Sequence, residues 1–275
     1  MKQHKWMAPP WLACPGLVRA EGDYVRRHAA WLAGLTEGER AEYARLFPAP
    51  PFWGEGEPAL WARTAHRARR LWRPGGGPAY GRTELERDWA AGARPEFVFF
   101  WNPDPTPEGR LSQWWPADFA VDGVTYCCME QYMMAEKARV FGDGPILSRI
   151  LASADPGEIK ALGRQVAGFD GRVWDVHKYT VVLEGNFQKF LQNPELKRLL
   201  LDTGERVLTE ASPYDRIWGI GLGREEPDAA LPPRWLGQNL VGFALMEVRG
   251  QLRRVCAAEE QIDWALSVGP QEEDG

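Results

Sequence analysis

The sequence predicts an α+β protein that is predominantly helical, with a helical N-terminal extension in front of its main domain. Two observations lead to this class. Apolar residues at helical spacing, separated by strong helix breakers, fill residues 1–95. Beyond Pro95, short β-type runs mix with longer helical patterns. We therefore expect a helical extension over residues 1–95, a main domain over 96–254 and an acidic tail over 255–275.

The extension begins with two expected helices. Residues 23–35 carry apolar side chains at mixed helical spacing. Thr36 is followed three residues later by Glu39, the pattern of a capping box, in which each side chain accepts a hydrogen bond from the other residue's backbone N–H. The second helix should therefore start next to Thr36, and it should end before Pro48.

A third expected helix runs from Pro58 to Leu71 and is ended by the glycine- and proline-rich residues 74–78. Residues 63–73 are rich in arginine. They either contact nucleic acid or another phosphate, or they form a solvated helix face. Charge runs more often face water, so the second interpretation is preferred and the first stays open.

The main domain opens with a short β-type run at residues 97–101. Longer helices should follow over residues 127–141, 173–191 and 243–252, because apolar side chains recur there at helical spacing. Asn239 stands in front of the last of these, where we expect it to cap the helix.

The expected helix over residues 127–141 has one unusual face. That face carries Glu130, Met133, Met134, Lys137 and Phe141. Burying an acid and an amine costs several kcal/mol unless they are paired or used by a ligand. The two Cα atoms should lie roughly 10 Å apart, enough to bracket a sugar. A solvated pair on an amphipathic helix is the equally weighted alternative.

The expected helix over residues 173–191 should bury one row of apolar side chains. These are Val176, Leu183, Phe187 and Phe190. Trp174 and Lys178 share a neighbouring face. Lys189 lies near the end of the helix, where a lysine usually extends its amine to the surface.

Residues 208–221 should form a loop that is dense in functional groups. The segment contains Glu210, Ser212, Asp215, Arg216 and Trp218. Such a density is typical of a site built on a loop that rigid elements hold in place. The glycines at 219, 221 and 223 do not indicate a dinucleotide site, since no strand and helix flank them, but they permit close approach of the backbone to a ligand.

Composition excludes several classes of protein. Residues 96–253 carry 17 Lys and Arg against 22 Asp and Glu, so the main domain is not a broad phosphate-binding surface. The four cysteines form no CxxC pair, which favours a reducing cytoplasm over a disulfide framework and, with only four scattered histidines, argues against a metal site. No apolar run is long enough to span a membrane, and prolines interrupt the apolar residues 6–18, which disfavours a signal peptide.

A series of short motifs follows in one unbroken order over about residues 97–252. They are Leu111-Ser112, Tyr126, Met129-Glu130-Gln131-Tyr132, Lys137-Ala138, Leu162-Gly163-Arg164, Trp174, Lys189-Phe190, Leu199-Leu200, Thr203-Gly204, Glu210-Ala211-Ser212-Pro213, Asp215, Trp218-Gly219-Ile220-Gly221, Asn239-Leu240, Gly242 and Met246-Glu247-Val248-Arg249. Each motif is weak alone, but the series closely resembles the NADAR family, also called YbiA-like.

The resemblance implies a compact, helix-rich α+β domain with N-glycosidase activity and no metal or redox cofactor. Some family members act on phosphoribosylamino-pyrimidine intermediates of riboflavin synthesis, and others remove ADP-ribose from modified guanine in nucleic acid. By position, Glu130, Lys137 and Asp215 match the catalytic residues that we expect. The residues that we expect to contact substrate are Ser112, Trp174, Lys178, Lys189, Glu210, Trp218, Gly219 and Asn239.

Three departures from the family pattern concern the pocket. The family usually has Ser-Asn where Ser112-Gln113 stands, an Arg where Lys178 stands and a His where Gln131 stands. Gln113 and Lys178 are therefore expected to change the shape of the phosphate or sugar pocket. Residues 1–95 have no counterpart in the pattern.

The resulting hypothesis is a cytoplasmic hydrolase that removes ADP-ribose from modified guanine in nucleic acid or nucleoside. Two alternatives stay open: an N-glycosidase acting on phosphoribosylamino-pyrimidines, and a module that binds ADP-ribose or NAD without turnover. Glu130 would stabilise positive charge or handle a proton, and Asp215 would position ribose hydroxyls or a water. Lys137 would either form an imine with the sugar or remain a phosphate-binding cation. Trp174 and Trp218 would stack on a base.

Overall fold

The structure is a computed structural model that describes residues 6–13, 22–50, 53 and 77–267. The expected arginine-rich helix over residues 58–71 and the last residues of the acidic tail lie outside these ranges. Helices dominate the described residues and the strands are few and short, so the expected α+β, predominantly helical class is confirmed.

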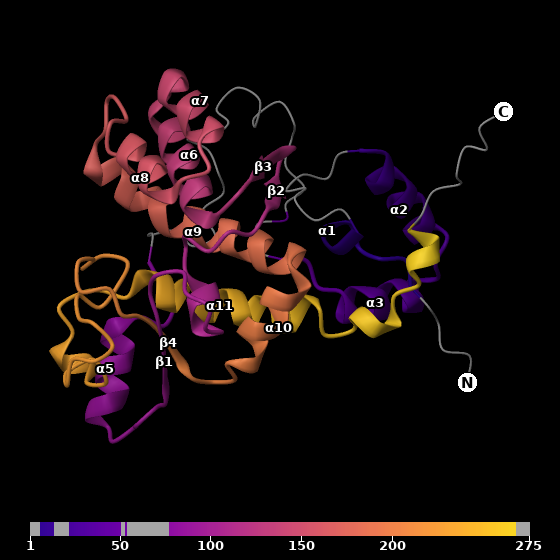
Figure 1. Cartoon of the computed structure of the whole chain (residues 1–275). Coiled ribbons are helices and arrows are strands. Elements are labelled where there is room, and N and C mark those ends of the chain that lie inside the picture. Colours follow the sequence, from indigo (N-terminus) through magenta and orange to yellow (C-terminus); the bar gives the residue numbers. More distant parts are fainter. Residues whose placement is uncertain (1–5, 14–21, 51–52, 54–76, 268–275) are drawn as a thin grey trace.

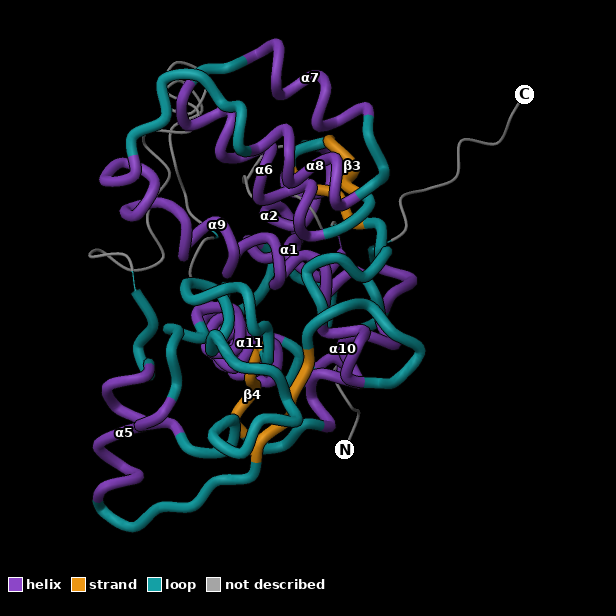
Figure 2. The backbone as a smooth tube through the Cα atoms, turned by 60° about the vertical axis from the view of Figure 1, so that its left-hand side comes forward, coloured by secondary structure: helices purple, strands orange, loops and turns teal. Residues whose placement is uncertain are grey.

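Helix α9 (Gly171–Gln192) runs through the middle of the main domain (Figures 1 and 2). Helices α6 (Met129–Phe141) and α11 (Leu240–Val255) pack against it. Leu183, Phe187 and Phe190 are fully buried, as their spacing predicts. Val176 was expected in the same row, but it is 46% exposed. The first turns of α9 are mostly exposed, so helical spacing alone could not bury that residue.

Two small sheets complete the domain. Strands β1 (Phe97–Phe100) and β4 (Val207–Glu210) pair in parallel, with Phe100 opposite Glu210. Strands β2 (Phe119–Val121) and β3 (Val124–Tyr126) form an antiparallel hairpin. Because β1 and β4 are parallel, the residues that follow them emerge at the same edge. This edge is where ligands commonly bind beside parallel strands.

Helix α11 lies directly on β4, and one glycine makes this possible. A Cβ atom on Gly242 would stand 2.0 Å from the Leu208 carbonyl oxygen. Any side chain at this position would therefore push the helix away from the strand and from the loop that β4 leads into.

Four shorter helices of the described chain surround this framework. Helices α7 (Gly144–Ala152) and α8 (Pro156–Gly163) pack on α6, and α10 (Pro194–Asp202) packs on α9 and α11. Helix α5 (Arg82–Ala90), which the sequence patterns did not single out, packs against the 3-10 turn η2 (Pro232–Arg234).

The N-terminal helices α1 (Pro10–Ala13), α2 (Asp23–Ala33) and α3 (Glu37–Leu46) form a separate group beside the last described turns (Figure 1). The capping box of Thr36 and Glu39 is present, as expected. Trp6 pairs with the turn η3 (Glu259–Gln261), donating from its backbone N–H to the Gln261 carbonyl at 3.1 Å and accepting from Asp263 N at 2.8 Å. Both ends of the described chain therefore contribute to this group.

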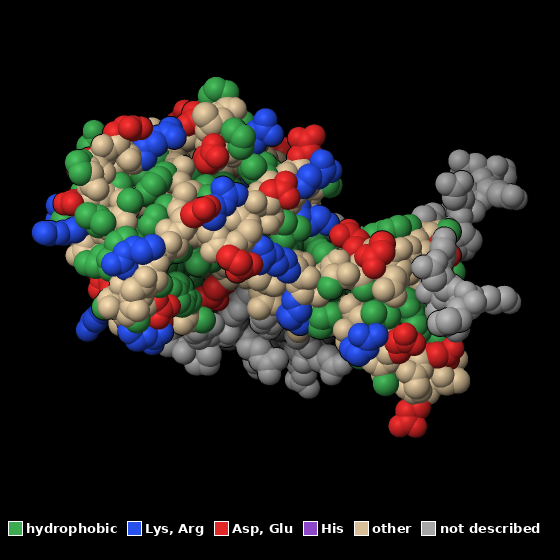
Figure 3. All heavy atoms as spheres, turned by 90° about the horizontal axis from the view of Figure 1, so that it is seen from below, with side chains coloured by type: hydrophobic (Ala, Val, Ile, Leu, Met, Phe, Trp, Pro, Cys, Tyr) green, Lys and Arg blue, Asp and Glu red, His purple; other side chains and the backbone are tan. Residues whose placement is uncertain are grey.

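Two further observations concern the surface. No helix among the described residues has the length and apolar character needed to cross a membrane. On the face shown in Figure 3, basic and acidic side chains alternate and no patch of a single sign stands out.

Candidate active site

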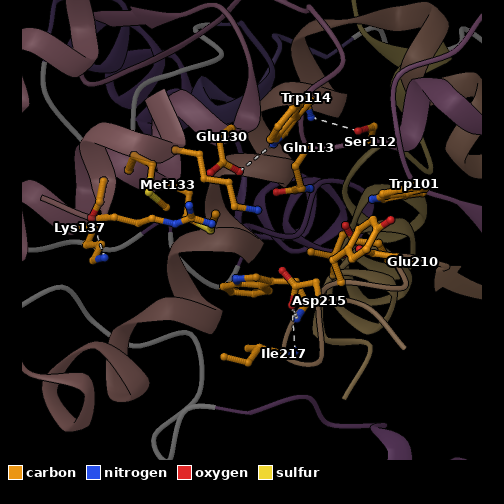
Figure 4. A pocket seen from close by; sticks show the side chains of 18 of the residues that line it. Trp101, Ser112, Gln113, Trp114, Glu130, Met133, Lys137, Glu210, Asp215 and Ile217 are labelled. Atoms are coloured by element: carbon orange, nitrogen blue, oxygen red, sulfur yellow. Dashed lines mark hydrogen bonds between the residues drawn. The ribbon is translucent and has the colours of Figure 1, made fainter. Parts of the chain in front are cut away.

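A pocket of about 540 Å³ opens at the edge where β1 and β4 end (Figure 4). Helix α6, the start of α9, the end of α8 and the segment over residues 112–114 form its other walls. Its lining residues are Trp101, Asn102, Ser112, Gln113, Trp114, Glu130, Met133, Met134, Lys137, Lys160, Gly163, Arg164, Phe169, Trp174, Glu210, Ser212, Tyr214, Asp215, Ile217, Trp218 and Val241.

The pocket brings together most of the site residues that the sequence indicates, from four separate segments of the chain. They are Ser112, Glu130, Lys137, Trp174, Glu210, Asp215 and Trp218. In Figure 4, Lys137 lies at one end and Glu210 at the other, with Glu130 and Asp215 between them. The acid–amine face that spacing predicts on α6 is thus turned into a cavity.

Glu130 is a buried acid of α6 that faces the pocket. It is 3% exposed, and its Oε2 accepts a hydrogen bond from the Trp114 indole N–H at 3.3 Å. Its Oε1 is buried and has no hydrogen-bond partner among the described residues. Burial raises the pKa of Glu130 to about 7, against the attraction of Lys160. This carboxyl can therefore hold or release a proton near neutral pH.

Glu210 provides a second acid of the same kind from the end of β4. Its Oε2 is shielded from water and has no partner in the described part of the chain. Burial, helped by repulsion from Asp215 and Glu130, raises the pKa of Glu210 to about 8. Two buried carboxyls with raised pKa values thus face one cavity, a pattern typical of functional sites.

Asp215 lies in the loop after β4 and is partly exposed. Its Oδ1 accepts hydrogen bonds from the backbone N–H groups of Ile217 at 2.9 Å and Trp218 at 2.8 Å. These bonds shape the loop and hold the Trp218 indole at the pocket wall. Asp215 therefore both organises the loop and adds a carboxylate to the pocket.

Lys137 stands at the far end, where the charge of Arg164 acts on it. A third cation, Lys160, lines the pocket near Trp114 and Glu130. The Lys137 Nζ donates to the Gly163 carbonyl oxygen at 2.7 Å and lies 4.2 Å from the centre of the Phe169 ring. Partial burial lowers the pKa of Lys137, while Glu130 opposes that change. The end of the pocket that carries Lys137 and Arg164 is suited to a phosphate group.

Four predicted contact residues do not line the pocket. Lys178 pairs with Asp175 at 2.7 Å on the outer part of α9. Lys189 is fully buried beneath the pocket, not extended to the surface as expected, and its Nζ donates to the Ser112 carbonyl oxygen at 2.9 Å. Burial lowers the pKa of Lys189 to about 7. Gly219 is buried within the loop behind Trp218.

Asn239 is the fourth of these residues, and the expected helix cap is wrong. It precedes α11 with a φ of 54°, but its side chain makes no capping bond. Its Oδ1 accepts from Glu210 N at 2.9 Å, and its Nδ2 donates to the Leu208 carbonyl oxygen at 2.9 Å. Asn239 thus continues the hydrogen bonding of β4 like an extra strand, and it positions Glu210 from behind.

Several pocket residues were missed by the sequence patterns. Trp101 lies just past β1, and the exposed Tyr214 packs against it with ring centres 5.8 Å apart. Trp114 directly follows the Ser-Gln motif, and Lys160 comes from α8. The motif containing Arg164 was recognised without a role. The parallel pairing of β1 with β4 brings Trp101 to the loop after β4 that carries Tyr214. The spacing of residues along the sequence does not predict that pairing.

The arrangement combines aromatic walls, two protonatable carboxyls and a cationic end. It can hold a base, a sugar and a phosphate in line, and it can exchange a proton beside the sugar. Within the described ranges, no group of three His, Cys, Asp or Glu side chains is placed to share a metal ion.

Comparisons with known proteins agree on this part of the chain. The family model for the NADAR domain matches residues 99–253, which contain every pocket-lining segment. An N-glycosidase from Acanthamoeba polyphaga mimivirus is 41% identical over 161 residues, which cover 56% of this chain and 95% of the viral protein. A riboflavin biosynthesis protein from Vibrio vulnificus is 29% identical over 156 residues, 57% of this chain but 38% of that protein. The NMR structure of the Escherichia coli protein YbiA matches with a TM-score of 0.49 at 27% identity, covering 61% of this chain and 89% of that chain.

Proposed function

Because the chain belongs to the NADAR domain family, we propose that it is an N-glycosidase that hydrolyses the bond between a ribose and a base. One observation carries the proposal most directly. Glu130 and Glu210 place buried, unpartnered carboxyl oxygens in one pocket with Asp215 and Lys137. A cavity that leaves such atoms without partners is incomplete without a polar ligand.

The reaction requires negative charge near the anomeric carbon and a proton for the departing base. Glu130, with a pKa of about 7, is suited to donate that proton when the glycosidic bond breaks. Asp215 would position a water or the ribose hydroxyls, since it is the least buried of the three acids. The indoles of Trp174 and Trp218 would stack on the base or on adenine.

Lys137 has two alternative roles. In one, its neutral amine attacks C1 of the ribose, the base leaves with its bonding electrons and the proton from Glu130, and the ring opens to an imine that water later hydrolyses. In the other, Lys137 stays protonated and binds phosphate. Its bond to the Gly163 carbonyl and its place over Phe169 favour the cation, whereas burial favours the amine.

The proposed substrate is an ADP-ribosylated guanine in nucleic acid or a nucleoside. The three cations Lys137, Lys160 and Arg164 line the pocket, and their number matches a pyrophosphate better than a single phosphate. A phosphoribosylamino-pyrimidine is the second candidate, and its support is the relationship to a riboflavin biosynthesis protein. The cysteine usage keeps the cytoplasm as the proposed compartment.

The test is to incubate the protein with an ADP-ribosylated guanine oligonucleotide and, separately, with the phosphoribosylamino-pyrimidine. We expect free ADP-ribose to be released from the first. Release only from the second would replace the proposed substrate. Tight binding of ADP-ribose with release from neither would replace the enzyme by a binding module.

Borohydride trapping during turnover then separates the two roles of Lys137. A covalent sugar adduct that is present in the native protein and absent from Lys137→Met supports the imine route. The matched control is Lys197→Met, because Lys197 pairs with Glu259 away from the pocket. No adduct in the native protein, with full activity, would remove the imine route.

A further inference from the structure

Gln113 presents a buried hydrogen-bond acceptor to the pocket that no described residue of the chain satisfies. The residue lines the cavity and is 6% exposed. Its Nε2 donates to the Asn186 Oδ1 at 3.3 Å, but its Oε1 is buried without a partner among the described residues. In Figure 4 the amide of Gln113 lies beside Glu130, with its oxygen on the side of that acid. A buried acceptor left unpaired costs about 1–3 kcal/mol, so a ligand donor is its natural complement.

The orientation of this amide follows from the residue behind it. Asn186 is fully buried on α9, and its Nδ2 donates to the Val182 carbonyl oxygen at 2.9 Å. A carbonyl can only accept, so the Asn186 amide nitrogen must point to Val182 and its oxygen to Gln113. Gln113 must then use its nitrogen toward Asn186. In this relay of hydrogen bonds from Gln113 through Asn186 to Val182, the side-chain oxygen of Gln113 is the amide atom that remains to bind a ligand in the pocket.

The backbone around Gln113 is held just as firmly. One turn from Asn186, Lys189 donates its Nζ to the Ser112 carbonyl oxygen at 2.9 Å. The Gln113 carbonyl oxygen in turn accepts from Glu130 N at 3.0 Å. The acceptor of Gln113 and the carboxyl of Glu130 are therefore parts of one rigid assembly, as a preorganised site requires.

Resting on the N-glycosidase activity proposed above, we propose that Gln113 Oε1 accepts a hydrogen bond from the ribose 2-hydroxyl and selects ribosyl over 2-deoxyribosyl substrates. Glu130 is placed to protonate the base, so the anomeric carbon must lie beside it. Of the two ring atoms next to that carbon, only C2 carries a hydrogen-bond donor. A neutral amide that can only accept also excludes a phosphate oxygen from this position.

The experiment compares ADP-ribose with its analogue lacking the 2-hydroxyl on the terminal ribose, both measured by calorimetric binding. The native protein should bind the hydroxylated ligand about tenfold more tightly, the contribution of one buried hydrogen bond. Gln113→Met, which keeps the side-chain length, should bind both ligands with equal affinity. Asn186→Leu, which frees the amide to rotate, should give an intermediate preference.

The matched control is Gln165→Met, because Gln165 is an exposed amide outside the pocket, and it should retain the native preference. Thermal unfolding of each variant separates a lost fold from a lost contact, since a purely structural role would change stability and leave the ratio of the two affinities unaltered. If the native protein binds both sugars equally, or if Gln113→Met keeps the preference, the role of Gln113 is wrong while the N-glycosidase proposal stands. If the native protein binds neither sugar, the proposed ADP-ribosyl substrate is wrong and the role of Gln113 falls with it.

Discussion

The N-terminal aromatic cluster, formed by Trp6, His28, Trp31, Tyr43 and Phe47, and the active-site pocket both bury titratable groups in neutral form. In the cluster, burial lowers the pKa of His28 to about 4. Its Nε2 lies 2.7 Å from the Tyr43 hydroxyl, which donates to the Met7 carbonyl oxygen at 3.0 Å. The one hydroxyl proton is thus used, so His28 donates to Tyr43. This chain of bonds closes within the protein.

In the pocket, by contrast, the chains of hydrogen bonds end at polar atoms that no described residue pairs with. Glu130, Glu210 and Gln113 each keep one buried oxygen without a partner among the described residues. The two regions show that burial of a polar group has two different consequences in this molecule. A buried polar group whose bonds all end inside the protein stabilises the fold, whereas one that faces a cavity with an unused atom is reserved for a ligand. The following changes test that distinction, from the largest expected effect to the smallest.

Glu130→Gln should have the largest effect. It keeps an acceptor for Trp114 but removes the proton donor, so kcat/KM should fall about a hundredfold to ten-thousandfold. Stability at pH 8 should not fall, because a buried charge is removed. Single-turnover kinetics and chemical denaturation measure the two quantities. Glu184→Gln is the control, since Glu184 is equally buried but accepts from the Tyr132 hydroxyl away from the pocket. Equal losses of activity in both variants would refute the role of Glu130.

Tyr43→Phe should show the opposite pattern. It leaves the His28 donor unpaired, so the free energy of unfolding should fall by about 1–3 kcal/mol while kcat/KM stays at the native value. Denaturation monitored by tryptophan fluorescence and the glycosidase assay give the two results. A loss of activity in the folded variant would mean that the N-terminal cluster acts on the pocket.

Glu210→Gln should stabilise the protein at alkaline pH. The pKa of Glu210 rises from 4.5 in the unfolded chain to about 8 in the fold, so between these values the folded state holds a proton that the unfolded state has released. The free energy of unfolding therefore decreases as pH rises through this window. The substitution should remove part of that slope, on the order of 1 kcal/mol at pH 8. An unchanged slope from pH 5 to pH 8 would show that Glu210 is solvated.

His28→Gln should change stability on the acid side and by the smallest amount. The pKa of His28 falls from 6.5 in the unfolded chain to about 4 in the fold. Between these two pH values the unfolded state binds a proton at His28 and the folded state does not. Stability is therefore lost as pH falls from 6.5 to 4, the reverse of the pocket carboxyls. The variant should lose roughly 1 kcal/mol less of its free energy of unfolding than the native protein over this pH range. Urea denaturation at pH 7 and pH 5 measures this difference. An equal loss of stability between the two pH values in the variant would exclude His28 as the cause.

Much of the local structure could be predicted from the sequence. The capping box of Thr36 and Glu39, the helix that carries Glu130 and Lys137, and the run at residues 97–101 all rest on signals within a few residues of each other. The face of α6 was also recognised, because helical spacing dictates which side chains point the same way. Spacing alone does not decide whether that face meets solvent or a ligand pocket.

The errors share a physical cause. Lys189 and Val176 lie on one helix, and spacing alone predicts the lysine at the surface and the valine in the core. The neighbours of α9 reverse this outcome, covering Lys189 completely and leaving Val176 46% exposed. Asn239 likewise has the residue type of a helix cap, yet it bonds to β4 because that strand lies against α11.

The sequence alone determined several of the helices, the order of the family motifs and the acid–amine face of α6, since each depends on residues close together in the chain. Only the tertiary structure decided which groups remain unsatisfied around the pocket. The relay from Asn186 to Gln113 joins α9 to the segment before β2, and Glu210 meets Asn239 through the packing of α11 on β4. Such pairings depend on how distant segments fill space, and no local pattern encodes that.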